Sequence, residues 1–447
     1  MVIQLENKTI VAVVAVIILI GASVGVALIL NGPNDKDPVI ETGRLVVYGN
    51  ANNDDYLDDR DVNFIEDIVN GVTVWDREEN PFADTNTDGV IDNKDVELLK
   101  KFIKKESATM YYYDYAGTVQ SIHYPITGNL SVIYNYGLDA SIILGCYDRV
   151  VAAGNNVITT ISNTETRYPG LKDMINLRDP VGDPEDLMQA GKDHNVKAIF
   201  GIGESYVTTI QDKLKAANSD IDVITINTSG YKGMSCDYLG GIITLGVMFG
   251  CEENAYKYIK SVDNILGYLE DKLADAPNYT YVAAHNPSNA STVSIRTTSS
   301  NGSVAGNIHT INMLPLTDLF GGKQASTGPT ANIEDIAAKM DPDVIIISTW
   351  AMITDSMTYA EAQNMFENMA SYLQICDAYK DKKIFCATFE SYGTYSGIAA
   401  LPLLAAYIWP DLVDEDYGWK TLQEYYDTYT MLDVDVKKVG CFAPHKL

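Results

Sequence analysis

The chain has 447 residues, of which 46% are hydrophobic, and a formal net charge of −28. This length predicts two or three folded units rather than a single core. The acidic balance excludes a nucleic-acid-binding surface, which needs a basic footprint, and only five histidines weigh against an enzyme with several histidine metal ligands. The 29 tyrosines suit a wet, aromatic-lined recognition surface.

The N-terminal segment predicts a membrane anchor over residues 1–30. Residues 9–30 carry no charge, and a helix of this length would span about 33 Å, enough to cross the hydrocarbon core. The run is longer than the apolar region of a signal peptide, although a cleaved signal is the alternative. Lys8 precedes the run and acidic residues follow it, so we expect a single-pass anchor in the cell membrane with most of the chain outside the cell. Residues 31–43 then form a polar linker.

Two segments of similar sequence, 50–61 and 84–95, follow the linker. Acidic and amide side chains recur at matching positions, and the apolar residues after each segment are spaced as one helix face. Calcium prefers six to eight oxygen ligands, which such loops supply from side chains at positions 1, 3, 5 and 12 and from the carbonyl at position 7. The candidate Ca²⁺ ligands are Asn50, Asn52, Asp54, Tyr56 and Asp61 in the first loop, and Asp84, Asn86, Asp88, Val90 and Asp95 in the second.

Residues 44–106, with two loop–helix units and aspartate at position 12, resemble a dockerin, a duplicated calcium-binding module that docks onto cohesin domains. The resemblance implies bound Ca²⁺ and a cohesin-like protein partner. The first loop departs from the pattern at Asn50, which removes a charge, and at Asp55, where glycine is usual. Gly89 keeps that glycine in the second loop, so we expect the first site to be the weaker.

From about residue 118, short apolar runs rich in β-branched residues alternate with helical stretches. This alternation predicts an α/β fold with doubly wound sheets, in which ligands bind beyond the carboxyl ends of the strands. A sequence echo between residues 184–187 and 333–336 indicates two similar lobes, over 118–250 and 278–447. Residues 251–277, which end at a proline, predict a long helix that joins the lobes.

The large domain, over about 118–429, resembles a substrate-binding protein of the iron-siderophore, haem and cobalamin uptake class. Residues 138–154 resemble its opening strand–helix–strand, 334–347 its second-lobe signature and 401–412 its closing helix. The resemblance implies a small-molecule metal complex or a corrinoid as ligand and an ABC-transporter permease as partner. It also implies that Glu185 and Glu334, one on each lobe, dock onto the permease, although glutamate is also ordinary at a helix N-terminus.

The residues that suit ligand binding lie in loops at the expected cleft. Aromatic rings can stack on a flat macrocycle, an arginine can pair with a carboxylate, and a histidine can reach an iron centre or serve the structure alone. The candidates are Tyr134, Tyr136, Tyr206, His285, Arg296, Trp350 and Tyr392.

No catalytic motif favours an enzyme. The G-x-S-x-G pattern at 21–25 lies inside the apolar N-terminal run, and no H-E-x-x-H is present. We therefore expect a membrane-anchored extracellular solute-binding protein that is not an enzyme. The alternative is a surface scaffold or adhesion component assembled through dockerin–cohesin contacts, without transport. The six cysteines fit either disulfides or buried thiols.

Overall fold

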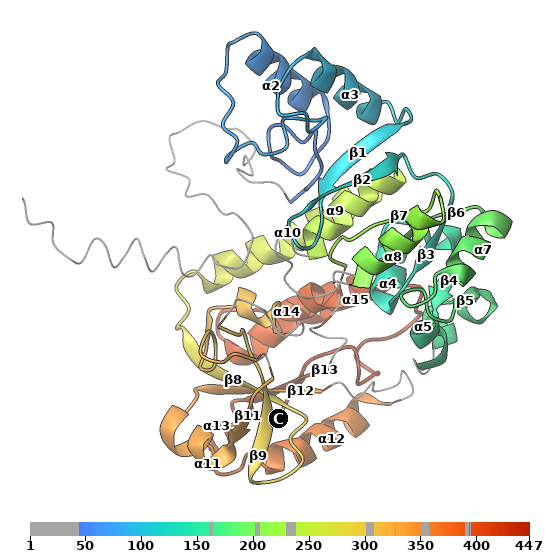
Figure 1. The fold of residues 1–447 in the computed structure, drawn as a ribbon. Helices are drawn as coiled ribbons and strands as arrows, with labels where there is room; N and C mark the ends of the chain where they lie inside the picture. The colour runs from blue at the N-terminus through green and yellow to red at the C-terminus, as the bar shows by residue number, and fades with distance from the viewer. Residues whose placement is uncertain are drawn as a thin grey trace, which may run out of the picture.

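The computed structural model describes residues 44–160, 164–201, 206–228, 238–300, 308–326, 328–349, 357–388, 393 and 395–447. The expected membrane anchor and linker lie outside these residues. Within the described part, no helix is both long and apolar enough to cross a bilayer. In chain order the fold consists of a small loop–helix module, a β-hairpin, a first lobe, a long joining helix and a second lobe (Figure 1).

The loop–helix module contains α2 (Asp59–Val69) and α3 (Asn93–Ile103), each of which begins at the end of one sequence repeat. Asp58 caps α2 and Asp92 caps α3, and each forms a capping box with the aspartate three residues later. The cap satisfies backbone N–H groups that have no partner inside the helix. Identical cap chemistry in the two repeats therefore sets both helix starts at the same loop position.

A hairpin that the sequence analysis did not predict connects the module to the first lobe. Its strands β1 (Ala108–Tyr113) and β2 (Val119–Tyr124) pair antiparallel. The turn is held by Asp114, whose carboxylate accepts the N–H groups of Ala116 at 2.9 Å and Thr118 at 2.8 Å. On one side, the Tyr48 N–H donates to the Tyr111 carbonyl at 2.9 Å, and on the other the Tyr115 N–H donates to the Thr225 carbonyl at 2.7 Å. The hairpin thus joins the backbones of the module and lobe 1.

Lobe 1 is built on a five-stranded sheet in the order β5-β4-β3-β6-β7, with every neighbouring pair parallel. Parallel strands need crossover connections, which helices supply here. The strands are β3 (Asn129–Val132), β4 (Val150–Gly154), β5 (Ile175–Leu177), β6 (Val196–Phe200) and β7 (Asp222–Val223). The helices are α4 (Asn135–Ile143), α5 (Asn155–Thr160), α6 (Thr164–Arg167), α7 (Glu185–His194), α8 (Tyr206–Ala216) and α9 (Tyr238–Phe249), with 3₁₀ turns η1 (Tyr147–Arg149) and η2 (Leu171–Asp173).

The lobes are joined by α10 (Glu252–Leu273), a helix of 22 residues. Its buried residues recur every three or four positions, which gives one apolar face. That face packs against α9 of lobe 1 and α14 (Ser396–Ile408) of lobe 2. The joining helix therefore belongs to the core of both lobes.

Lobe 2 contains a seven-stranded sheet in the order β11-β9-β8-β12-β13-β14, with β10 also paired to β8. Its strands are β8 (Tyr279–His285), β9 (Thr292–Arg296), β10 (Leu316–Asp318), β11 (Thr330–Asn332), β12 (Val344–Thr349), β13 (Ile384–Thr388) and β14 (His445–Lys446). Its other helical segments are η3 (Ile311–Met313), α11 (Ile333–Asp335), the π-helical turn η4 (Ile336–Met340), α12 (Tyr359–Ser371), α13 (Asp377–Lys380) and α15 (Glu415–Tyr429).

The expected α/β class is confirmed, but the expected parallel strands account for only part of lobe 2, where β8, β10, β12 and β13 are parallel. Strands β9, β11 and β14 run antiparallel to their neighbours. Only six residues separate β8 from β9, and so short a connection cannot carry a crossover. The sheet of lobe 2 is consequently mixed.

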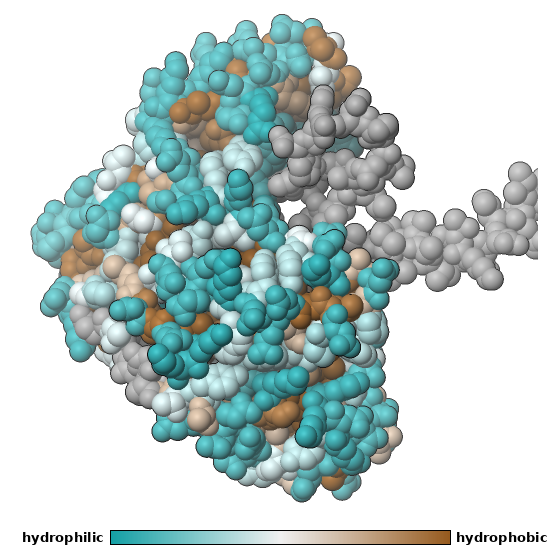
Figure 2. Space-filling model, turned by 180° about the vertical axis from the view of Figure 1, so that it is seen from behind, coloured by the Kyte–Doolittle hydropathy of each residue, from teal (hydrophilic) through white to brown (hydrophobic). Residues whose placement is uncertain are grey.

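The surface of the described residues carries the hydrophilic side chains that the composition requires. On the face drawn in Figure 2, hydrophilic residues dominate and apolar residues form small separate patches. Scattered apolar residues of this kind are normal on a protein surface and do not by themselves mark an interface.

A buried arginine fastens the loop–helix module to the joining helix. The Arg44 guanidinium donates to the Asp55 carboxylate, with Nε 3.0 Å from Oδ2, and to the Asp263 carboxylate on α10 at 2.9 and 3.0 Å. The side chains of Arg44 and Asp55 are only 9% and 4% exposed. An ion pair of 2.5 Å between Lys105 and Glu252 adds a second link to α10. Asp55, which stands where the calcium-loop pattern has glycine, therefore serves this attachment.

We expect Arg44→Ala to lower the free energy of unfolding by about 3–5 kcal/mol, because it leaves the buried Asp55 carboxylate without its cation. Arg60→Ala is the matched control, since the Arg60 side chain is 56% exposed and pairs with Asp54 and Asp58; its loss should cost less than about 1 kcal/mol. Urea denaturation of the three proteins measures both values. Equal losses in the two variants would contradict the role given to Arg44.

Candidate functional site

Two glycines allow close backbone contacts at the carboxyl ends of β4 and β6 in lobe 1. A Cβ on Gly154 would lie 2.5 Å from the Ile133 carbonyl oxygen, and a Cβ on Gly201 would lie 3.1 Å from the Cα of Gly137. Gly201 also has φ +93°, which favours glycine. The chain order of the sheet reverses between β3 and β6, and ligands of open α/β sheets bind outside such a reversal point.

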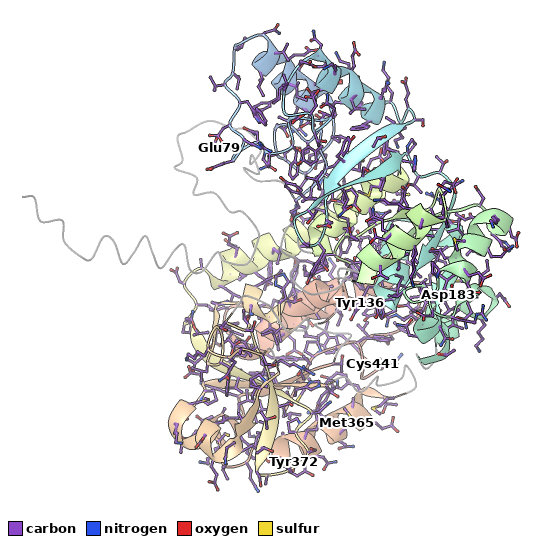
Figure 3. All side chains as sticks on the ribbon, viewed as in Figure 1. Glu79, Tyr136, Asp183, Met365, Tyr372 and Cys441 are labelled. Atoms are coloured by element: carbon purple, nitrogen blue, oxygen red, sulfur yellow. The ribbon has the colours of Figure 1, made fainter. Side chains whose placement is uncertain are left out.

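Two predicted ligand residues stand at this point. Tyr134 is the N-cap of α4, and Tyr136 lies in the first turn of that helix. Both side chains are half-buried. In Figure 3, Tyr136 lies on the edge of lobe 1 toward lobe 2. The predicted Tyr206 begins α8, but its side chain is outside the described part of the chain.

Two asparagines that the sequence analysis missed lie at the same end of the sheet. Asn155 follows β4 directly, and Asn176 in β5 donates through Nδ2 to the Asn155 Oδ1 at 2.9 Å. The Asn176 Oδ1 is buried and has no hydrogen-bond partner among the described residues. For Asn155, the signal in the sequence was a polar residue immediately after an apolar strand.

Lobe 2 presents a histidine at the corresponding point of its own sheet. His285 ends β8 and lies opposite Ser348 of β12, where the chain order of that sheet reverses. The His285 Nδ1 is 3.0 Å from the Ser348 Oγ, and its Nε2 is 3.2 Å from the Asn286 Nδ2. His285 is buried, and this burial, followed by the nearby charge of Arg296, lowers its pKa from 6.5 to about 4. The ring is consequently neutral at physiological pH.

Arg296 ends β9 and shares a face of the sheet with His285. It lies opposite Ala283, two residues before His285, so the two side chains point to the same side. Arg296 is half-buried. The structure thus brings His285 and Arg296 together in lobe 2. The two remaining ligand candidates, Trp350 and Tyr392, lie outside the described residues.

Many tyrosines do not form the recognition surface that their number suggested. Among the tyrosines whose side chains the structure describes, seven are less than 2% exposed: Tyr112, Tyr168, Tyr238, Tyr258, Tyr281, Tyr395 and Tyr426. Several of these pack at the junction of the lobes, where the ring of Tyr395 lies 5.4 Å from that of Tyr238 and 6.0 Å from that of Tyr258. The Tyr258 hydroxyl donates to the Tyr395 carbonyl at 3.1 Å. For these residues the expectation was wrong, because their rings fill the core instead.

A pocket of about 360 Å³ opens on the outer edge of lobe 1, between the hairpin, α8 and β7. Two of its acidic side chains already have partners: the Asp222 carboxylate lies 3.1 Å from the His123 Nδ1, and Asp220 pairs with Lys197 outside the lining. It is lined by none of the predicted ligand residues. We therefore place the candidate site at the strand ends and not in this pocket.

The two predicted docking glutamates occupy matching positions. Glu185 begins α7, which leads into β6, and Glu334 lies in α11, which leads through η4 into β12. Both side chains are exposed. β6 adjoins the first strand of lobe 1, and β12 adjoins the first strand of lobe 2. The sequence echo therefore corresponds to equivalent places in the two lobes.

The second predicted calcium loop holds its carboxylates through backbone N–H groups. Asp95 accepts from Asn86 at 3.0 Å and from Asp92 at 2.9 Å, and Asp84 Oδ2 accepts from Gly89 at 2.8 Å. The other oxygen, Asp84 Oδ1, is buried and has no hydrogen-bond partner among the described residues. A buried carboxylate oxygen without a donor is costly unless a cation neutralises it. This loop therefore fits a calcium ion.

The first loop repeats these hydrogen bonds but uses its first position differently. Asp61 accepts from Asn52 at 3.1 Å and from Asp58 at 2.9 Å, as Asp95 does in the second loop. The Asn50 amide donates to the Leu45 and Asp54 carbonyls, and its oxygen accepts from the Asp54 N–H at 3.1 Å. Burial raises the pKa of Asp61 to about 7. The Asn50 side chain at position 1 is thus already satisfied by backbone groups of the loop and of Leu45.

No cluster of three or more His, Cys, Asp or Glu side chains among the described residues is arranged to hold a metal ion. In both loops the aspartates accept backbone N–H groups instead. The chemistry of the second loop still suits calcium, because its side-chain donors are three carboxylates and one amide, with the carbonyl of Val90 at position 7.

Comparison with known proteins relates the fold, but not the sequence, to solved structures. No protein-family model and no curated protein matches the chain. A TroA-like periplasmic binding protein, FepB, from Veillonella parvula is similar with a TM-score of 0.56 and 14% identity, over 75% of this chain and 99% of that one. The molybdate periplasmic binding protein MolA from Haemophilus influenzae, bound to molybdate, gives 0.51 and 15%, over 71% and 97%. At these identities the likeness shows a shared fold.

We expect the neutral state of His285 to make stability depend on pH. The unfolded chain binds a proton at His285 near pH 6.5, whereas the folded protein does so only near pH 4. The stabilisation is therefore complete above pH 6.5 and is lost as the pH falls toward 4. Urea midpoints between pH 7 and 4.5 should fall more steeply in the wild type than in His285→Asn. Parallel curves would contradict the lowered pKa; His445, whose pKa burial also lowers to about 4, contributes equally to both proteins.

Proposed function

We propose that this chain is an extracellular solute-binding protein that captures a small metal complex or a related anionic ligand and delivers it to an ABC permease. The observation that carries the proposal is the pairing of two separate sheets, joined by α10, each of which places polar or aromatic side chains at its own reversal point. Proteins of the same fold include the periplasmic binding proteins named above, one of which is bound to molybdate.

The side chains at the two reversal points favour a ligand with acceptor groups and a flat or aromatic portion. Lobe 2 contributes the charged Arg296 and the neutral His285. Lobe 1 contributes Tyr134, Tyr136 and the amide pair of Asn155 and Asn176. Arginine binds carboxylate or oxyanion oxygens, and tyrosine rings stack on planar groups. A ferric siderophore, haem and cobalamin can satisfy both preferences, and a simple oxyanion satisfies only the preference for acceptor groups.

Attachment to the membrane and to a permease completes the proposal. Residues 9–30 would anchor the chain, and Glu185 and Glu334 would contact permease arginines from the two lobes. Their exposure and their matching places in the lobes support this role. A surface scaffold joined to cohesin-like proteins through the loop–helix module is the competing function.

We also propose that the module binds calcium, and that the second loop is the stronger site. Asp84, Asn86, Asp88 and Asp95 would provide side-chain oxygens, and Val90 its carbonyl. The buried, unpartnered Asp84 Oδ1 supports this assignment. In the first loop, Asn50 is already bonded within the loop and Asp55 is paired with Arg44. A calcium ion in the first loop would therefore have one carboxylate ligand fewer than a calcium ion in the second loop.

We expect calorimetry of the full chain against a ferric siderophore, haem, cobalamin and molybdate to detect micromolar or tighter binding of one member. Tyr136→Ala should weaken that binding about tenfold, a loss of about 1.4 kcal/mol. Tyr372→Ala, at an exposed tyrosine of lobe 2 (Figure 3), should not weaken the binding.

The double variant Glu185→Ala/Glu334→Ala should keep the ligand affinity but should no longer capture the permease. If none of the four ligands binds and only cohesin-like proteins are recovered with the chain, the result would favour the surface scaffold function.

Calcium titration of the wild type and of Asp84→Asn separates the two loops. We expect Asp84→Asn to lower the tighter calcium affinity at least about tenfold, because it removes the charge of a buried ligand. Glu97→Gln, an equal charge change on the exposed side of α3, is the control and should leave the affinity unchanged. Unaltered binding in Asp84→Asn would rule out the second loop as the stronger site.

A further inference from the structure

Two cysteines far apart in the sequence are held together where lobe 1 meets the joining helix. Cys146 follows the end of α4, and Cys251 is the N-cap of α10. Two hydrogen bonds fix the segments around them: the Asn254 Nδ2 donates to the Leu144 carbonyl at 2.9 Å, and the Arg149 Nη1 donates to the Phe249 carbonyl at 3.1 Å. The Cys251 thiol donates to the same Phe249 carbonyl at 3.7 Å.

We propose that Cys146 and Cys251 form a disulfide bond in the extracellular protein. The two flanking hydrogen bonds hold the segments that carry Cys146 and Cys251 side by side, which is the backbone placement that a disulfide requires. Oxidising conditions outside the cell allow such bonds to form and persist.

The surroundings of the two thiols indicate the order of the reaction. Cys251 is half-buried, whereas Cys146 is only 2% exposed. The neighbouring Cys146 thiol lowers the pKa of the Cys251 thiol to about 7, and the positive charge of Arg149 acts in the same direction, while burial opposes both. The neighbouring Cys251, followed by burial, raises the pKa of the Cys146 thiol. Cys251 is therefore the accessible nucleophile, since the thiolate is the reactive form.

The reaction is a thiol–disulfide exchange with an external disulfide, such as oxidised glutathione or the disulfide of a protein oxidase. The Cys251 thiolate attacks one sulfur of that disulfide and forms a mixed disulfide with it. The other external sulfur leaves as a thiolate. Cys146 then loses its proton and attacks the Cys251 sulfur, and the second external thiolate leaves. The two protein thiols are oxidised by two electrons, and the external disulfide is reduced to two thiols.

Such a bond would close a covalent loop around most of lobe 1. Roughly 100 residues lie between the two cysteines, and a disulfide that closes a long loop stabilises mainly by restricting the unfolded chain. The loop contains β4, β5, β6 and β7. It would secure these strands to the start of α10, the helix that also carries the second lobe.

Peptide mapping tests the proposal on the full chain. The protein is equilibrated in a buffer of oxidised and reduced glutathione, quenched in acid, alkylated and cleaved before aspartates. We expect a fragment of residues 139–147 disulfide-linked to a fragment of residues 237–262, which separates Cys251 from Cys236. Cys251→Ser should abolish the linked pair, and Cys376→Ser, at a cysteine of lobe 2, should retain it.

A thermal readout complements the mapping. Reductant should lower the midpoint of unfolding in the wild type and in Cys376→Ser but not in Cys251→Ser. Alkylation of both Cys146 and Cys251 in the oxidised wild type, or linkage of either to another cysteine, would overturn the proposal. None of these results depends on which ligand the protein binds.

Discussion

The packing of α10 is the constraint on which the rest of the structure depends. One face of this helix is buried between α9 of lobe 1 and α14 of lobe 2, so both cores include it. Its remaining surface carries Glu252 and Asp263, which pair with Lys105 and Arg44 of the loop–helix module. A continuous helix resists bending, because a kink breaks its backbone hydrogen bonds. The two lobes are therefore held at a defined separation, and ligand capture would involve limited hinge motion.

The loop–helix module shows how neighbours can change the use of a repeated sequence. Both loops bind their last aspartate through the same two backbone N–H groups and begin their helices with the same cap. The second loop leaves a buried carboxylate oxygen of Asp84 without a donor. In the first loop the corresponding side chain, Asn50, is hydrogen-bonded within the loop, and the Asp55 carboxylate accepts from the Arg44 guanidinium. The second repeat thus suits a cation better, while the first also attaches the module to α10.

Burial also determines which of two neighbouring basic side chains carries a positive charge at the candidate ligand site. Two neighbouring cations are unfavourable in a poorly hydrated position, and the group with the lower intrinsic pKa gives up its proton first. His285 accordingly becomes neutral and Arg296 keeps its charge. Lobe 2 then presents one positive charge beside a neutral imidazole, an arrangement that suits a ligand with a single dominant anionic group on that side.

The sequence by itself determined the elements that depend on local pattern: the two loop–helix repeats, the apolar strands, the helix at 252–273 and the matching glutamates of the two lobes. Local caps and periodicity suffice for these because their physical causes lie within a few residues. The tertiary structure decided the antiparallel strands of lobe 2, the hairpin at 108–124, the burial of tyrosines such as Tyr258 and the meeting of Cys146 with Cys251. Each of these depends on which distant segments pack together, and a linear pattern carries no information on that choice.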